Sequence, residues 1–80
     1  QLYPNPGNGA FTLAFEVPQS GQYTLDLVDV HGRVIQRLFE GQLTEKEYFT
    51  RAFEVQAPSG LYFVNIRSAG SRGTVRLVIR

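Results

Sequence analysis

One stretch, residues 60–67, constrains the fold more than any other, because it packs strand-forming residues between two clear turn signals. Pro-Ser-Gly opens the stretch and Ser-Ala-Gly follows it. Side chains alternate between the faces of a strand, so Tyr62, Val64 and Ile66 share a wholly apolar face that we expect to cover a core. The opposite face starts apolar and ends charged, as in a strand whose outer surface is partly covered. The pattern predicts a central strand.

The rest of the chain repeats this alternation. Further strands are predicted over residues 10–17, 23–28, 34–39, 48–55 and 74–80, and residues 42–47 form either a short edge strand or a turn. In residues 48–55 Arg51 interrupts the apolar face, so we place this strand at a sheet margin or at a bulge, where the guanidinium reaches water. Short turns and the lack of an amphipathic helical stretch predict an all-β fold of about seven strands. The expected form is an immunoglobulin- or fibronectin-like antiparallel sandwich over residues 10–80, with a small barrel as the alternative.

Two turns set the predicted registers. Asp29 and Gly32 suit a three-residue hairpin loop, whereas a two-residue loop at residues 31–32 would shift the pairing by one and put Gln36 against Leu27. Residues 70–73 are expected to turn the chain into the last strand. The predicted pairs are Val28–Val34, Leu27–Ile35 and Tyr23–Phe39 in the first hairpin, and Asn65–Arg76, Ile66–Val75, Val64–Leu77 and Tyr62–Ile79 in the last.

Length and charge narrow the function classes. A chain of 80 residues with no cysteine is one domain whose core must come from its ten aromatic residues and its aliphatic ones. Eight basic and seven acidic residues give no reason to expect nucleic-acid or anionic-membrane binding, and we identify neither an apolar run that could span a bilayer nor a secretory leader. Residues 1–9 contain two prolines and two Asn-flanking glycines, so we expect an entry loop at a junction with an upstream part of a longer protein.

The inventory of reactive groups is thin. His31, the single histidine, lies in the predicted hairpin loop, where an exposed turn residue is far more common than a catalytic base. There is no Cys nucleophile, and Ser59 and Ser71 lie at turns, where serine makes local hydrogen bonds. The sequence therefore predicts a protein that is not an enzyme.

Metal and phosphate sites are equally unsupported, so no cofactor is expected. The candidate ligands at loop ends are Asn5, Asn8, Asp26 and Asp29, and their spacing matches no calcium loop. The glycines of residues 7–9 and 70–73 are not followed by a helix that could hold a phosphate, so both read as ordinary turns.

The arginines around the last hairpin form the one notable group. Beside exposed apolar side chains they could form a recognition surface, in which the apolar patch provides area and the arginines provide directed hydrogen bonds. The simpler interpretation is that charges on outer positions keep the strands soluble, and spacing alone favours it. The candidate surface comprises Leu61, Phe63, Arg67, Arg76 and Arg80, with Arg72 nearby.

Four segments together resemble a known family. They read YPNP at residues 3–6, DxxGR at residues 29–33, SGLYFV at residues 59–64 and GxxxTxRLVIR at residues 70–80. In this order they are similar to the C-terminal sorting domain of cargo proteins of the type IX secretion system of Bacteroidetes-type bacteria. Members usually carry Lys where this chain has Arg76 and Arg80, so charge is kept but contacts that need a compact ammonium would differ.

The resemblance implies an address that directs an upstream cargo domain through the periplasm and the outer-membrane translocon to the cell surface or beyond. It also implies that a surface sortase removes the domain in the linker before residue 3, and that the cargo can be joined to anionic lipopolysaccharide. The motif residues implied are Pro4, Asn5, Pro6, Gly60, Leu61, Tyr62, Gly70, Thr74, Arg76, Leu77, Val78, Ile79 and Arg80.

Two other function classes compete with this interpretation. An adhesive or carbohydrate-binding accessory sandwich would need exposed aromatic side chains along a concave face, and Tyr3, Tyr48 and Phe63 are the candidates. A small hydrolase is the third class, and the missing nucleophile and base argue against it.

Overall fold

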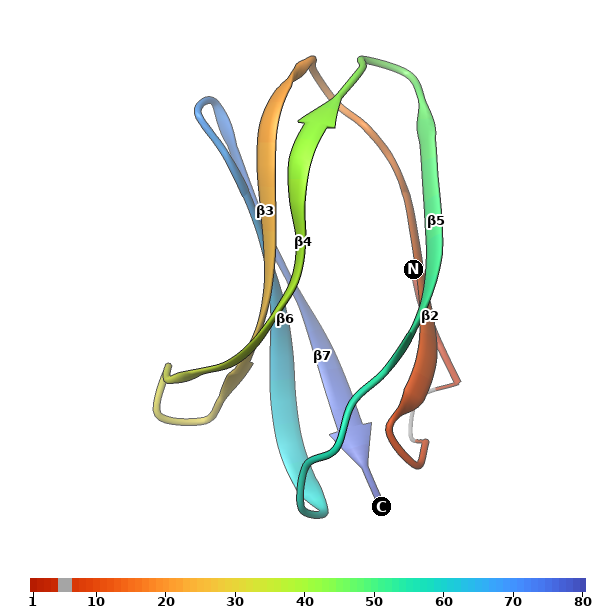
Figure 1. The fold of residues 1–80 in the computed structure, drawn as a ribbon, viewed down its shortest axis with the longest axis vertical. Coiled ribbons are helices and arrows are strands. Elements are labelled where there is room, and N and C mark those ends of the chain that lie inside the picture. The colour runs from red at the N-terminus through yellow and green to blue at the C-terminus, as the bar shows by residue number, and fades with distance from the viewer. Residues whose placement is uncertain (5–6) are drawn as a thin grey trace.

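The computed structural model describes residues 1–4 and 7–80, which form two β-sheets packed face to face (Figure 1). The smaller sheet has the order β1-β2-β5 and contains β1 (Leu2–Tyr3), β2 (Ala10–Glu16) and β5 (Tyr48–Glu54). The larger sheet has the order β4-β3-β6-β7 and contains β3 (Gly21–Asp29), β4 (Val34–Leu43), β6 (Gly60–Ser68) and β7 (Ser71–Ile79). All strand pairs are antiparallel, so the predicted sandwich is confirmed. The barrel is wrong, because no strand of one sheet pairs with a strand of the other in the part described.

The seventh strand lies elsewhere than the sequence indicated. Residues 42 and 43 continue β4, and residues 44–47 turn the chain, with the amide of Glu47 donating to the carbonyl of Thr44 at 3.0 Å. The additional strand is β1, which begins within the expected entry loop and pairs Leu2 with Leu13. The side chain of Leu2 is buried in the common core. Residues 1–4 thus pack on the sandwich. Separately, the described residues form no helix that could cross a membrane.

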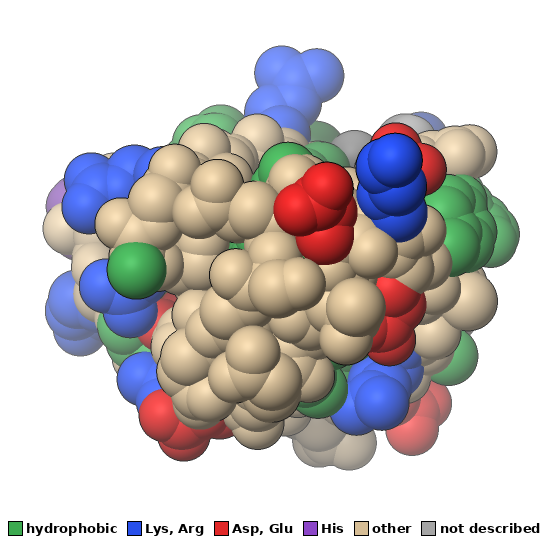
Figure 2. All heavy atoms as spheres, turned by 90° about the horizontal axis from the view of Figure 1, so that it is seen from above, with side chains coloured by type: hydrophobic (Ala, Val, Ile, Leu, Met, Phe, Trp, Pro, Cys, Tyr) green, Lys and Arg blue, Asp and Glu red, His purple; other side chains and the backbone are tan. Residues whose placement is uncertain are grey.

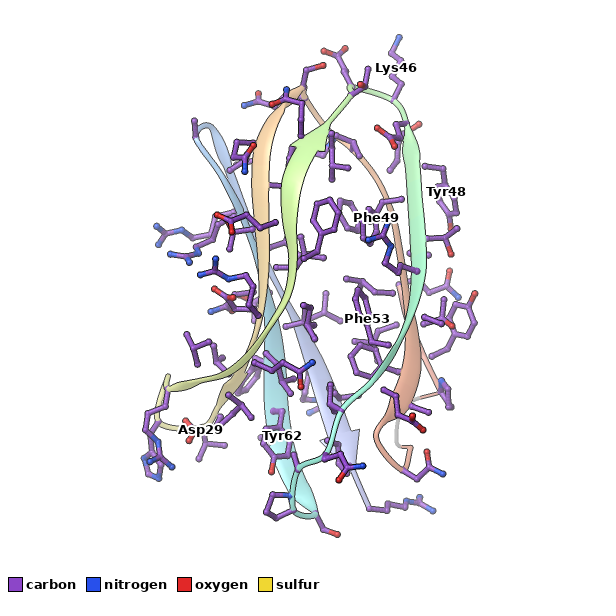
Figure 3. All side chains as sticks on the ribbon, in the orientation of Figure 1. Asp29, Lys46, Tyr48, Phe49, Phe53 and Tyr62 are labelled. Atoms are coloured by element: carbon purple, nitrogen blue, oxygen red, sulfur yellow. The ribbon has the colours of Figure 1, made fainter. Side chains whose placement is uncertain are left out.

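The core fills the space between the two sheets. The stretch singled out in the sequence is β6, which lies between β3 and β7 and is therefore central, as predicted. Tyr62 and Val64 of β6 are buried, and Ile66 packs partly buried against them. From the smaller sheet, Phe49 and Phe53 of β5 point toward β4 between the layers (Figure 3). Each fully buried large apolar side chain stabilises the fold by roughly 1.5–3 kcal/mol.

The register of β3 with β4 begins as predicted and then departs from it. Val28 pairs with Val34, but Leu27 lies opposite Gln36 and Tyr23 opposite Gly41, so the predicted pairs Leu27–Ile35 and Tyr23–Phe39 are wrong. Two register shifts in β4 leave Ile35 and Leu38 as extra residues, as β-bulges do. The shifts expose Ile35 and bring Arg37 opposite Asp26.

The register of β6 with β7 is displaced by two residues from the prediction. The turn is formed by Ala69 and Gly70, with Ser68 opposite Ser71, rather than by residues 70–73. Tyr62 consequently pairs with Leu77, Val64 with Val75, Asn65 with Thr74, Ile66 with Gly73 and Gly60 with Ile79. A shift by an even number of residues keeps every side chain on its face, so the predicted inward positions are confirmed although all four predicted pairs are wrong.

Arg51 lies on the inner face of β5, at the margin of the smaller sheet, which confirms the predicted edge position. No register shift occurs between β5 and β2, so no bulge is involved. The guanidinium carbon of Arg51 lies 5.1 Å from the ring centre of Phe39 and 5.5 Å from that of Phe49. Its charge stays at the open side of the sandwich while its stem covers aromatic surface.

Two corners of similar sequence lead into the central strands β3 and β6. We call residues 19–23 the first corner and residues 58–62 the second corner. The hydroxyl of Tyr23 donates to the carbonyl of Gln19 at 2.7 Å, and the hydroxyl of Tyr62 donates to the carbonyl of Pro58 at 2.6 Å. Each strand begins with a glycine, Gly21 or Gly60, whose φ is 157°, a conformation that L side chains rarely adopt. Each corner buries a tyrosine and satisfies its hydroxyl locally.

Candidate recognition surface

Three segments far apart in the sequence meet where β7 ends. The amide of Gly7 donates to the carbonyl of Val78 at 3.0 Å, and the amide of Arg80 donates to the carbonyl of Gly7 at 2.8 Å. On its other side the same part of β7 pairs with the start of β6, where Leu61 lies opposite Val78. We call this meeting of Gly7, residues 60–62 and residues 77–80 the junction; it lies at the lower end of the molecule in Figure 1.

Close backbone contact fixes the entry segment beside the junction. The amide of Val55 donates to the carbonyl of Gly9 at 2.9 Å. Gly9 has φ of 106°, and a Cβ there would lie 2.6 Å from the carbonyl oxygen of Val55. Both the conformation and the space therefore require glycine at this position.

The β3–β4 hairpin lies at the same end as the junction. Asp29 is the Cα partner of Tyr62, and both side chains lie at the lower end of Figure 3, whereas Lys46 lies at the opposite end. Gly32 has φ of 82°, which confirms the predicted left-handed residue of the loop. His31 is exposed in this loop, as predicted, and its amide donates to Asp29 Oδ1 at 2.9 Å.

Asp29 holds the hairpin loop together. Arg33 donates to the Asp29 carboxylate from its amide at 3.0 Å and from Nε at 2.9 Å. Loss of hydration works to raise the pKa of Asp29, but the hydrogen bonds from Arg33 and His31 outweigh it, and the net effect lowers the pKa below its ordinary value. Asp29 thus acts as the acceptor that shapes the turn.

Four of the five candidate recognition residues lie together on the outer face of the larger sheet. Phe63 lies opposite Arg76 on β7 and beside Val28 on β3. Leu61 is 39% exposed, and Arg80 is exposed just beyond the end of β7. Together with Val78, these residues form an apolar strip with cationic side chains along β7. We call Leu61, Phe63, Arg76, Val78 and Arg80 the outer patch.

The fifth residue, Arg67, belongs to a different cluster. Arg67 Nη2 donates to Asp26 Oδ2 at 3.1 Å, and Arg37 Nε donates to Asp26 Oδ1 at 2.6 Å. Asp26 is only 1% exposed, so these two arginines compensate a buried charge. The hydrogen bond and the charge of Asp26 also raise the pKa of Arg37. Arg67 is therefore engaged in the fold, about four residues along the strand from Phe63.

This cluster corrects the placement of Asp26 among candidate ligands at loop ends. Asp26 lies in the middle of β3, and both of its carboxylate oxygens accept from arginine. Asn8 makes a local turn contact instead, with its Oδ1 accepting from the amide of Ala10 at 3.3 Å. Within residues 1–4 and 7–80, no three His, Cys, Asp or Glu side chains gather as metal ligands would. The opposite charges of Arg37 and Asp26 are visible in the sequence. Their pairing can be inferred only once β3 is known to lie between β4 and β6.

The other predicted motif residues are spread along the larger sheet and the entry segment. Pro4 is exposed, whereas Asn5 and Pro6 lie outside the described residues. Gly70 lies in the β6–β7 turn, and Thr74 Oγ1 donates to Asn65 Oδ1 at 3.1 Å in the half of β7 away from the junction. Ser59 lies in the turn before β6 and Ser71 opens β7. Leu77 and Ile79 are core residues.

The aromatic candidates for carbohydrate binding do not form one platform. Tyr3 and Tyr48 are 47% and 62% exposed on strands of the smaller sheet, and Tyr48 points away from the sandwich in Figure 3. Phe63 lies on the outer face of the other sheet. Because the sandwich lies between Phe63 and the two tyrosines, the three rings cannot stack together on one sugar chain.

Charge is distributed unevenly between the sheets. The larger sheet and its hairpin loops, together with Arg80 just after β7, carry six arginines and three carboxylates, whereas the remaining segments carry two cations and four carboxylates. In the end-on view of Figure 2, basic side chains crowd one side of the molecule, while acidic and basic side chains alternate on the other. The outer face of the larger sheet is thus the more cationic surface, which suits an acidic partner.

Comparison with known protein families identifies the family to which this chain belongs. A family model described as a secretion system C-terminal sorting domain, of the Por secretion system, matches residues 1–80, the whole chain. No curated protein matches the chain. The resemblance drawn from the four segments is confirmed by this match. The chain belongs to the family of C-terminal sorting domains of type IX secretion cargo proteins, which are non-catalytic signals for secretion across the outer membrane to the cell surface.

Proposed function

We propose that the junction and the adjoining outer patch are the part of this domain that the outer-membrane translocon reads. The observation that carries the proposal is the convergence of three motif segments on one place: Gly7 after the entry motif, residues 60–62, and the end of the terminal strand. These segments lie far apart in the sequence, so only the folded domain presents them together. An unfolded tail would lack the surface.

Two kinds of residue divide the work at this site. Gly60, Tyr62, Leu77 and Ile79 build the corner and the core, so their role is to position the surface. Leu61 and the arginines of the outer patch point outward, and they are the residues that a partner would touch. Apolar area bordered by arginine is a common composition of protein interfaces.

The remaining steps follow from the family. The cargo would lie upstream in the same chain and enter the periplasm with an ordinary signal peptide. After passage through the translocon, a surface sortase would remove the domain. Because β1 pairs with β2 and Leu2 is buried, the cleaved linker would lie upstream of β1, and Pro4, Asn5 and Pro6 would stay with the removed domain.

The test is a secreted reporter fused to this domain in a host that has the type IX system. Deleting residues 76–80 would be uninformative, because it removes the core residues Leu77 and Ile79 and should unfold the domain. The double substitution Arg76→Gln and Arg80→Gln removes the two charges and leaves those residues in place. We expect surface reporter to fall by about tenfold while the purified domain stays folded.

A matched control removes two charges elsewhere. Lys46→Gln with Arg51→Gln changes net charge equally but lies outside the outer patch. We expect this variant to reach the surface at about the wild-type level. Equal export of both double variants would contradict the assignment of the outer patch, and a large loss of thermal stability in the first would assign Arg76 and Arg80 to the fold.

A further inference from the structure

The two edges of the larger sheet are built differently. β4 is shifted twice in register, whereas β7 pairs with β6 over nine consecutive residue pairs without any shift. Bulged edge strands resist pairing with another chain, and regular ones invite it. The smaller sheet has two edges: β1 has only two residues, and β5 is regular but spans seven residues, against nine in β7. β7 is therefore the longest regular edge of the sandwich and the one best suited to accept a further strand.

The backbone of β7 already shows which groups point outward. At the junction the carbonyl of Val78 and the amide of Arg80 bond to Gly7, on the side away from β6. These directions alternate along a strand, so the amides and carbonyls of Arg72 and Thr74 point to that same side. Among the residues that the structure describes, none makes a hydrogen bond to these four groups. The half of β7 nearest the β6–β7 turn thus offers an open ladder.

Charge selects what can occupy this edge. Arg72 lies directly opposite Arg67, and like charges in such a pair repel each other. Arg67 is compensated by Asp26, but no carboxylate of the described residues forms an ion pair with Arg72. A second copy of the domain, added antiparallel along β7, would bring further arginines to this edge. A segment rich in Glu or Asp would instead neutralise it.

We propose that residues 71–75 of β7 receive an extended acidic segment of a protein of the export machinery, which adds to the larger sheet as a fifth strand. This inference rests on the proposed function and names a second contact for the same partner system. Backbone hydrogen bonds to Arg72 and Thr74 would supply affinity, and carboxylates meeting Arg72 would supply selectivity. The site is separate from the outer patch, which lies toward the other end of β7.

The decisive pair of variants is Thr74→Pro and Thr74→Val. Proline removes the outward amide without breaking a bond to β6, as edge positions of a sheet allow. Valine keeps that amide but loses the same hydroxyl contact with Asn65, so it controls for the side chain. We expect surface reporter to fall about tenfold with proline and to stay within about twofold of wild type with valine. Equal export of both variants, with both domains folded, would overturn the proposal.

A second measurement reads strand addition directly and does not depend on export. The probe is a synthetic peptide of alternating Glu and Thr, with its Lys-for-Glu counterpart as the control, added to the isotope-labelled domain. Binding should slow hydrogen exchange at the amides of Arg72 and Thr74, and Arg72→Glu should weaken it by about tenfold without loss of thermal stability. Unchanged exchange at both amides at millimolar peptide, or equal binding of the Lys peptide, would overturn the proposal.

The export assay and the exchange measurement together distinguish a failure of this inference from a failure of the proposed function. If the reporter fused to the wild-type domain fails to reach the surface, the sorting function itself is wrong for this chain, and the exchange measurement still decides whether β7 accepts an acidic strand. If the wild-type fusion is exported and Thr74→Pro is exported equally, the sorting function stands and strand addition at β7 is wrong.

Discussion

The first and second corners have the same local structure and differ in sequence at the first and the fourth of their five residues. In both, a Ser-Gly pair is followed by a variable residue and then by a buried tyrosine, whose hydroxyl donates to the carbonyl four residues before it. They lead into β3 and β6, which are antiparallel neighbours, so the corners lie at opposite ends of the sandwich (Figure 1). The variable residue is Gln22 in the first corner and Leu61 in the second.

This comparison separates building from recognition within a single motif. The sequence Ser-Gly-X-Tyr also occurs at the first corner, where no partner is expected. Its glycine and tyrosine therefore serve the fold. What distinguishes the second corner is an apolar side chain that the structure leaves 39% exposed opposite Val78. Leu61 is thus the residue of this motif that the fold does not explain.

The largest expected effect comes from removing either tyrosine ring. Tyr23→Ala and Tyr62→Ala should each lower the free energy of unfolding by about 3–5 kcal/mol, because each empties a large buried volume at a central strand. Urea unfolding of the purified variants measures this. A loss below about 1 kcal/mol in one of them would show that the two corners are not equivalent.

A smaller effect is expected at the corner glycines. Gly21→Ala and Gly60→Ala should each cost about 1–3 kcal/mol, because both glycines have φ of 157° while a Cβ would meet nothing closer than 3.8 Å. Gly73→Ala is the matched control: it also has free space around it, but its φ is not in that region. If all three variants unfold at the same urea concentration, backbone conformation is not what selects glycine at the corners.

Removing only the hydroxyls should have a modest effect. Tyr23→Phe and Tyr62→Phe each lose one hydrogen bond to a backbone carbonyl, which should cost about 0.5–1.5 kcal/mol. Thermal unfolding of the two variants side by side gives the comparison. A markedly greater loss of stability in Tyr62→Phe would mean that the second corner contributes more to stability than the first, through its contacts with the adjacent hairpin and the junction.

The faces of the strands were predictable from the sequence, whereas their neighbours were not. Alternation with a period of two assigns Tyr62, Val64 and Leu77 inward whatever strand they pair with. It cannot detect a register displaced by two residues, because such a displacement preserves every face. The register is set by the turn at Ala69 and Gly70. The sequence instead suggested a turn over residues 70–73, because that segment begins and ends with glycine.

The ion cluster at Asp26 shows the same limit at the level of a site. The bulges that leave Ile35 and Leu38 unpaired are what bring Arg37 opposite Asp26, and no apolar pattern marks them. The pairing of β3 with β6, which supplies Arg67, joins strands separated by two others in the sequence. Local chemistry, by contrast, was readable: Asp29 and Gly32 identified their turn because that turn needs an acceptor and a left-handed residue.

The smallest effect on stability is expected at the variable position between the glycine and the tyrosine of the corners, and it should come with a large effect on export. Leu61→Gln gives the second corner the residue of the first, and since Leu61 is exposed at the strand surface, the free energy of unfolding should change by less than about 0.5 kcal/mol. Export of the fused reporter should nevertheless fall about tenfold, because the outer patch loses an apolar contact.

The reciprocal change, Gln22→Leu, is the control for Leu61→Gln. It places a leucine at the first corner, at the opposite end of the sandwich, so it should leave both stability and export near the wild-type values. If Leu61→Gln is exported normally, the second corner is only a fold device like the first, and recognition must lie elsewhere on the larger sheet. If Gln22→Leu impairs export as much as Leu61→Gln does, export is sensitive to surface changes at either corner. The comparison then no longer assigns recognition to the junction.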